Sequence, residues 1–189
     1  EYNKKGDINN AIKYSKKTLN VYRELEDTIN TAAIENNLGK LFGEFNNIEE
    51  SFIHLNKAKE LRMKCKDGRI VDTLINICEN YIKLKDIVNS RKIIEEIKDN
   101  IDEKNSKSLV CYYMLKFRIN MIECNKKEAE NTLIDALNFA TKMNYTEEAA
   151  DISIKLGKFY EDSKKDKEAV KYLSEGVEIF KRIGILKEY

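Results

Sequence analysis

Residues 38–58 read LGKLFGEFNNIEESFIHLNKA, and this stretch decides the fold. Its first part has a large residue, a small one and then an aromatic, and its second part has a small, a large and a small residue. These six are Leu38, Gly39, Phe42, Ser51, Leu55 and Ala58. Spacings of three and four residues place side chains on one face of an α-helix. The stretch therefore predicts two helices that are joined by a polar turn and approach closely at their small residues.

The second half of this pattern recurs along the whole chain. Each copy starts with a small residue, which we call the anchor of its repeat, and successive anchors are 40, 39, 39 and 40 positions apart. The anchors are Ala11, Ser51, Ser90, Ala129 and Ala169. Nine positions before the anchor stands an aromatic residue in four of the five copies. A fixed period of this length indicates a stacked array of helix pairs, each with a helix A, a turn and a helix B.

The register predicts nine or ten antiparallel helices and no β-sheet. We expect turns inside the pairs near residues 5–7, 45–48, 85–87, 124–127 and 164–167. Junctions between pairs are expected near 27–30, 66–69, 102–107 and 144–147. A helix that runs unbroken through Gly6-Asp7 or Asn46-Asn47 would contradict this register.

The fourth repeat departs from the pattern, because Lys116 replaces the large residue and Asn120 the aromatic. One interpretation is an extra residue in its turn, which would put Leu115 and Ile119 in these two roles. The other is a distorted repeat. We favour the extra residue.

These residues closely resemble the tetratricopeptide repeat over nearly the whole chain. Residues 38–58 match the family's Leu-Gly, aromatic, Ala, large and Ala positions. The last repeat matches them again with Leu156, Gly157, Tyr160, Ala169 and Leu173. The resemblance implies an all-α superhelix, a solenoid of antiparallel helix pairs, with helix A on the concave side. Residues 1–189 would form a single domain of about five repeats, the first one truncated. The period exceeds the usual ~34 residues, and the family's closing proline is absent from every repeat.

Repeat length and composition also resemble a narrower group. These are the helix-turn-helix regulators and phosphatases of Gram-positive bacteria whose repeat domains bind peptide pheromones in quorum sensing. That likeness implies a cytoplasmic protein and an N-terminal DNA-binding domain outside these residues, so that DNA would be contacted only through that domain. The fragment would then be the ligand-sensing part of a transcriptional regulator.

Composition excludes several other classes of protein. A net charge of +1 does not fit a nucleic-acid-binding surface on this segment, and no apolar run approaches the ~20 residues of a membrane span. The four cysteines form no C-x-x-C pair, and His54 is the only histidine. We therefore predict no metal, no cofactor and no catalysis. His54 is interpreted as a helix-surface residue, and Cys78 and Cys111 as small buried thiols in a reducing compartment.

The helix A face carries the candidate binding site. Its inward positions hold amides, which both donate to and accept from a peptide backbone, and cations, which would hold a carboxylate. The predicted site consists of Asn36, Asn37, Lys40, Asn76, Glu79, Lys83, Arg118, Lys155 and Lys158. Asn80 is an alternative to Asn36. We expect an extended peptide of roughly five to ten residues along repeats 2 to 5. The cations favour either an acidic peptide or capture of a C-terminal carboxylate.

Three functional alternatives remain open from the sequence. The domain is a peptide-responsive sensor, a constitutive adaptor or scaffold for a protein partner, or a regulatory phosphatase subunit. We also predict that the C-terminal edge forms a homodimer contact or packs on further chain, because its apolar residues have no later repeat to cover them. These residues are Phe180, Ile183, Ile185, Leu186 and Tyr189.

Overall fold

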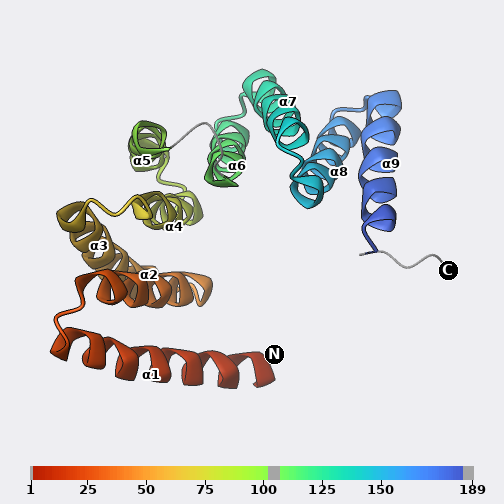
Figure 1. Cartoon of the computed structure of the whole chain (residues 1–189). Coiled ribbons are helices and arrows are strands. Elements are labelled where there is room, and N and C mark those ends of the chain that lie inside the picture. Colours follow the sequence, from red (N-terminus) through yellow and green to blue (C-terminus); the bar gives the residue numbers. More distant parts are fainter. Residues whose placement is uncertain (1, 102–106, 185–189) are drawn as a thin grey trace. The chain divides into compact units, whose positions relative to one another are not determined.

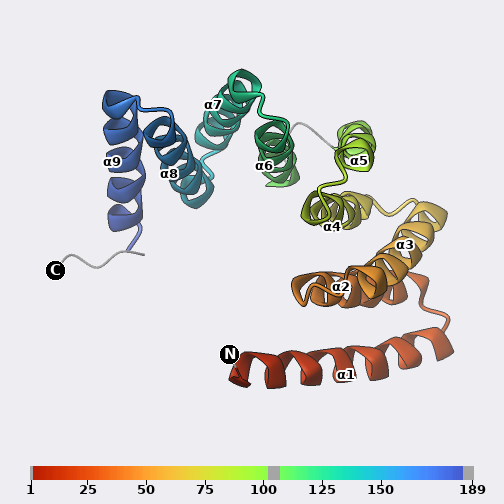
Figure 2. The same ribbon diagram turned by 180° about the vertical axis from the view of Figure 1, so that it is seen from behind.

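The computed structural model describes residues 2–101 and 107–184, with side chains from residue 9 onward. This described part consists of nine α-helices and contains no strand (Figure 1; Figure 2 shows the reverse side). The all-α prediction is confirmed. The helices group into two compact units, which we call unit 1 (Glu1–Ile101) and unit 2 (Asp102–Tyr189). The prediction of one domain over residues 1–189 stays a prediction.

Within each unit, consecutive helices pack against each other. Unit 1 contains α1 (Tyr2–Glu24), α2 (Thr28–Glu44), α3 (Ile48–Cys65), α4 (Ile70–Lys83) and α5 (Ile87–Asn100). Unit 2 contains α6 (Lys107–Ile122), α7 (Lys126–Lys142), α8 (Thr146–Asp162) and α9 (Asp166–Arg182). Helix A of repeats 2 to 5 is α2, α4, α6 and α8, and the helix that follows each of them is its helix B.

Four of the five predicted A–B turns are confirmed, because loops interrupt the helices at residues 45–47, 84–86, 123–125 and 163–165. In each loop, one residue has a left-handed backbone conformation with positive φ, and it lies five positions before the anchor. These residues are Asn46, Lys85, Cys124 and Lys164. Three loops end in a side-chain N-cap, in which Asn47, Asp86 or Asn125 accepts a hydrogen bond from a backbone N–H three residues on.

The junctions between pairs also follow the predicted period. Interhelical loops occupy residues 66–69 and 143–145, and the first junction lies at 25–27, slightly earlier than expected. The junction expected near 102–107 lies outside the described residues, apart from residue 107 at the start of α6.

The expected first turn is wrong. Helix α1 runs unbroken from Tyr2 to Glu24, straight through Gly6-Asp7. A glycine inside a helix costs only about 1 kcal/mol relative to alanine, so it does not break a helix by itself. The register that holds for the later repeats therefore does not extend to residues 5–7.

The extra residue proposed for the fourth repeat is also wrong, because the turn at 123–125 is as long as the other three. Asn120 occupies the position of the missing aromatic, where it is buried and donates from Nδ2 to Thr132 Oγ1 at 3.3 Å. Leu115 and Ile119 are buried as well. A buried amide–hydroxyl hydrogen bond thus replaces an aromatic contact between α6 and α7.

The small residues mark close helix–helix contacts, as predicted. The anchors Ser51, Ser90, Ala129 and Ala169 are all buried. A Cβ placed on Gly39 would lie 2.5 Å from Leu55 Cγ, and one on Gly157 would lie 2.6 Å from Leu173 Cγ. No real side chain tolerates such distances, so glycine is what lets helix B approach helix A.

One of the two cysteine predictions is wrong. Cys78 is fully buried and its thiol lies 3.7 Å from the carbonyl oxygen of Ser90, but Cys111 is exposed. Adjacent residues of a helix point about 100° apart, so the apolar neighbours of Cys111 do not share its direction. The apolar surroundings in the sequence were misleading for this reason.

At the C-terminal edge, Phe180 is half-buried in α9, and Ile183 is exposed just after it. Ile185, Leu186 and Tyr189 lie outside the described residues. The homodimer contact therefore stays a prediction. None of the described helices is long and apolar enough to cross a membrane.

Candidate functional site

The A helices of unit 1, α2 and α4, border a cavity of about 220 Å³. It is lined from α2, the start of α3 and α4 by Lys40, Gly43, Glu44, Ser51, Ile75, Asn76, Glu79, Asn80 and Lys83. Four of the nine predicted site residues are among them: Lys40, Asn76, Glu79 and Lys83. Predicted site residues from the A helices of two successive repeats therefore line the same cavity.

The floor of this cavity is a buried chain of hydrogen bonds. Asn80 Nδ2 donates to Ser51 Oγ at 2.7 Å, and the Ser51 hydroxyl donates to the carbonyl oxygen of Gly39. Gly43 makes room for this chain, since a Cβ there would lie 2.8 Å from Asn80 Oδ1. A satisfied network of this kind holds its members in fixed positions. The floor is thus rigid, and α2, α3 and α4 are tied together beneath the cavity.

Two further contacts align α2 with α4 at the rim. Asn76 Nδ2 donates to Asn36 Oδ1 at 3.1 Å, and Lys83 Nζ donates to the carbonyl oxygen of Gly43 at 2.8 Å. Gly43 belongs to the last turn of α2, and its carbonyl oxygen also accepts from the backbone N–H of Asn46 at 3.0 Å. The lysine adds a second donor to this helix end from the neighbouring repeat. Among the described residues, Asn76 has no partner for its second amide hydrogen or its carbonyl oxygen, so both can bind other groups.

The charges of the lining nearly cancel. Lys40 and Lys83 face Glu44 and Glu79 around the same cavity. The predicted acidic preference rests on the lysines, and these carboxylates offset them. Hydrogen bonding by amides, rather than a positive field, is what this cavity offers to a ligand.

The remaining predicted residues have different surroundings. Asn36 is buried and accepts from Asn76, and Asn37 is exposed on α2 outside the cavity lining. Arg118 is half-buried on α6, and Lys155 and Lys158 are exposed on α8. These last three belong to unit 2, so a groove along repeats 2 to 5 stays a prediction.

Asn80 was expected only as an alternative to Asn36 in the site, and its contact with Ser51 over Gly43 was not foreseen. Ser51 was recognised only as small, although a hydroxyl at a buried anchor requires a hydrogen-bond partner. That requirement was a signal, but the sequence does not say that Asn80 supplies the partner. Asn80 comes from the next repeat, 29 positions away.

A second polar cluster lies where α2 meets α1 and α3. Glu35 is only 1% exposed, and its two oxygens lie 2.6 Å from Arg23 Nη2 of α1 and 2.6 Å from His54 Nδ1 of α3. The His54 ring also stacks on Phe42 at 5.3 Å between centroids. The interpretation of His54 as a surface residue is therefore wrong, because its side chain is only 14% exposed. Helix periodicity did not reveal the buried carboxylate that draws it inward.

In unit 2, a buried phenol links the last two repeats. Tyr160 of α8 donates to Glu130 Oε1 of α7 at 2.8 Å and stacks on the ring of Tyr172 of α9. Burial raises the pKa of Tyr160 well above its usual value, and the Glu130 carboxylate raises it further. The phenol therefore stays protonated at any physiological pH and acts as a structural donor.

Comparison with known proteins agrees with this architecture. Residues 2–64 match the model of the family described as tetratricopeptide repeat. The structure of BtubC (BKLC) from P. vanneervenii superposes with a TM-score of 0.79 over 99% of this chain and 78% of BtubC, at 14% identity. Residues 2–64 therefore match the tetratricopeptide repeat, and the chain shares the fold of tetratricopeptide-like repeat proteins. No curated protein matches its sequence significantly.

Two further tetratricopeptide-like structures are similar. A Rap protein complexed with Competence and Sporulation Factor has a TM-score of 0.76 and 15% identity, over 94% of this chain and half of the Rap protein. A putative kinesin light chain with nearly identical TPR-like repeats, from Podosopora anserina, has a TM-score of 0.68 and 12% identity, over 97% of this chain and 92% of the other. At such identities the likeness concerns the fold.

The tetratricopeptide repeat is a scaffold for binding proteins and peptides, and this fold is generally non-catalytic. Adjacent A helices expose hydrogen-bonding side chains in rows, to which an extended chain can bind. The partner class of this protein is therefore a peptide or a protein.

Proposed function

We propose that this chain is the ligand-sensing domain of a bacterial transcriptional regulator, and that it binds a short extended peptide along the cavity between α2 and α4. The observation that carries the proposal is Asn76. It lies at the cavity rim, is held by Asn36 and retains unused amide hydrogen-bonding capacity. A peptide backbone needs such donors and acceptors when it leaves water.

The likeness to a Rap protein complexed with Competence and Sporulation Factor supports this proposal, since a protein of similar fold holds a ligand. The same proposal includes the whole regulator with a DNA-binding region, a cytoplasmic location and a role in quorum sensing. It also includes a groove that continues along Arg118, Lys155 and Lys158 in unit 2.

A constitutive adaptor is the alternative. It would hold a protein partner on the same repeats with no responding effector. The two functions differ in one observable: a sensor's full-length protein changes its affinity for operator DNA when peptide is added, whereas an adaptor's does not.

Replacing Asn76 by alanine is expected to weaken peptide binding by about 1–3 kcal/mol, because a peptide group then loses its partner in a buried place. The probe is a pooled library of random hexapeptides with free carboxyl termini, selected on the wild-type protein and then measured singly by calorimetry. Glu49→Ala, on the exposed side of α3, is the matched control and should leave the affinity unchanged. Equal affinities of wild type and Asn76→Ala for every selected peptide would place the site elsewhere.

A further inference from the structure

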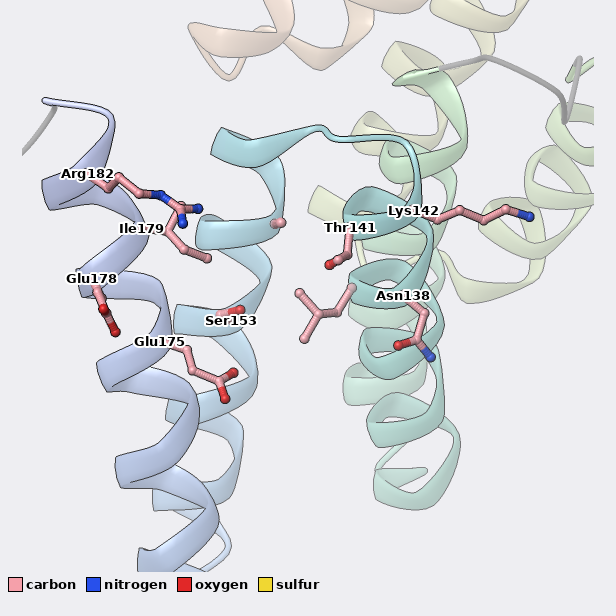
Figure 3. Close-up of a pocket in the computed structure, with 10 residues that line it drawn as sticks. Asn138, Thr141, Lys142, Ser153, Glu175, Glu178, Ile179 and Arg182 are labelled. Carbon is pink, nitrogen blue, oxygen red and sulfur yellow. The ribbon is translucent and has the colours of Figure 1, made fainter.

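A larger cavity, of about 580 Å³, lies on the helix B side of unit 2 (Figure 3). Helix α8 forms its floor with Ala149 and Ser153. The walls come from α7, with Leu137, Asn138, Thr141 and Lys142, and from α9, with Glu175, Glu178, Ile179 and Arg182. Its volume is that of an ordinary ligand site, roughly 300–1,000 Å³.

The cavity exists because repeat 5 has small residues at two positions where the earlier repeats, apart from Thr31 in repeat 2, have large ones. Sixteen positions before the anchor stand Glu35, Leu74, Tyr113 and Ser153, and twenty positions before it stand Thr31, Ile70, Leu109 and Ala149. In repeat 2 this place is filled, because Glu35 reaches Arg23 of α1 and His54 of α3. In repeat 3, Leu74 is fully buried. In repeat 5, the small residues of α8 leave the space between α7 and α9 empty.

The floor also contains an unused polar group. Ser153 is 2% exposed, it borders the cavity, and its hydroxyl makes no hydrogen bond within the described part of the chain. At the equivalent place in repeat 2, the Glu35 carboxylate has its partners inside the protein. The shorter Ser153 side chain reaches no such partner among the described residues, so the space above it is open to a side chain from outside.

The α9 wall has charges of both signs. Glu175 and Glu178 precede the apolar Ile179, and Arg182 lies one turn beyond Glu178. None of these three charged residues forms an ion pair with another described residue. Figure 3 shows Lys142, which also lines the cavity, extending away from α9, and Arg182 is the cation of the α9 wall. The seven positions from Glu175 to Arg182 span roughly 10 Å along the helix axis.

We propose that this cavity is a second binding site, distinct from the α2–α4 cavity, for a segment of a partner protein. A leucine- or tyrosine-sized side chain of the partner fills the space above Ala149 and Ser153, between Leu137 and Ile179. It takes the place that Leu74 fills from within the chain in repeat 3. A basic residue of the partner pairs with Glu175, and an acidic one pairs with Arg182.

These three groups lie on one face of an extended segment when they alternate with small residues. The probe is therefore acetyl-Lys-Ala-Leu-Ala-Glu-amide, together with its tyrosine analogue. The comparison peptide acetyl-Lys-Ala-Ala-Ala-Glu-amide lacks the apolar side chain. Burial of one leucine side chain predicts that the leucine probe binds at least ~10-fold more tightly than the comparison peptide.

Ser153→Leu tests the site from within, because it fills the cavity as Leu74 does in repeat 3. We expect the leucine probe to lose at least ~10-fold in affinity, measured by NMR titration, while the circular dichroism spectrum and melting curve show a folded protein. Unchanged affinity in a folded Ser153→Leu protein would overturn the proposal.

A surface charge reversal keeps the test independent of core packing. Arg182→Glu should weaken binding of the leucine probe and strengthen binding of acetyl-Lys-Ala-Leu-Ala-Lys-amide, whose terminal lysine meets the new carboxylate. Lys181→Glu makes the same charge change at the neighbouring exposed residue outside the cavity, and it should alter neither affinity. If both reversals act alike, the effect is one of net charge and the proposed site is wrong.

Discussion

Replacing Leu55 by alanine is expected to lower the free energy of unfolding of unit 1 by about 3–5 kcal/mol. Leu55 is fully buried on α3, and its side chain lies against Gly39 of α2 so closely that no Cβ would fit there. The two helix backbones are already as near as they can come, so they cannot close over the missing side chain. A cavity therefore remains and adds its cost to the lost burial.

Urea unfolding followed by circular dichroism measures this effect. Ile53→Ala is the matched control, because Ile53 lies two residues away on the same helix and is 57% exposed. It should change the unfolding free energy by no more than about 0.5 kcal/mol. Similar losses in the two variants would mean that α3 does not bury the face that the repeat pattern assigns to it.

Replacing Glu35 by alanine is expected to cost about 3 kcal/mol of stability, near the lower end of the range for breaking a buried ion pair. The change leaves His54 without the carboxylate that holds it against Phe42. Arg23 loses the same partner, but its side chain is half-exposed and returns to water, which limits the loss.

Glu35→Leu separates the loss of the carboxylate from the loss of side-chain volume. Leucine is the residue at the equivalent place in repeat 3, where Leu74 is fully buried. Like alanine, it leaves Arg23 and His54 without the carboxylate, but it fills the space that alanine leaves empty. We expect Glu35→Leu to cost less stability than Glu35→Ala, because only the alanine variant adds a cavity to the lost contacts. Thermal and urea unfolding of both variants gives the comparison. If Glu35→Ala unfolds like Glu49→Ala, the cluster contributes nothing to the fold.

The sequence predicted the architecture of repeats 2 to 5 because close packing restricts a few positions severely. Gly39 and Gly157 are required by the approach of Leu55 and Leu173, and such requirements recur with the repeat. The first repeat continues as a helix through Gly6, where the family turn was expected. In the fourth repeat, the Asn120–Thr132 hydrogen bond was not foreseeable from a pattern of residue sizes.

Inward positions of consecutive A helices were expected to share one surface, and Lys40, Asn76, Glu79 and Lys83 line one cavity. That a ligand binds to them stays a prediction. Which polar groups satisfy each other depends on contacts between repeats, as the Asn80–Ser51 and Asn76–Asn36 pairs show.

The sequence feature behind the cavity above Ser153 is a small residue at a position where the earlier repeats have larger ones. A repeat pattern is defined by what the repeats share, and this cavity arises where one of them differs. The pattern that predicted the fold therefore gave no sign of the second cavity.

The most direct test of the central claim is an NMR titration of the 15N-labelled chain with the tightest hexapeptide selected from the library. Binding along the α2–α4 cavity predicts that the largest chemical-shift changes occur at the backbone amides of Lys40, Glu79 and Lys83 and at the side-chain amide of Asn76. Shift changes confined to α3 and α5, or to α7 and α9, would contradict the proposed function, since the peptide would then bind away from the A helices of unit 1.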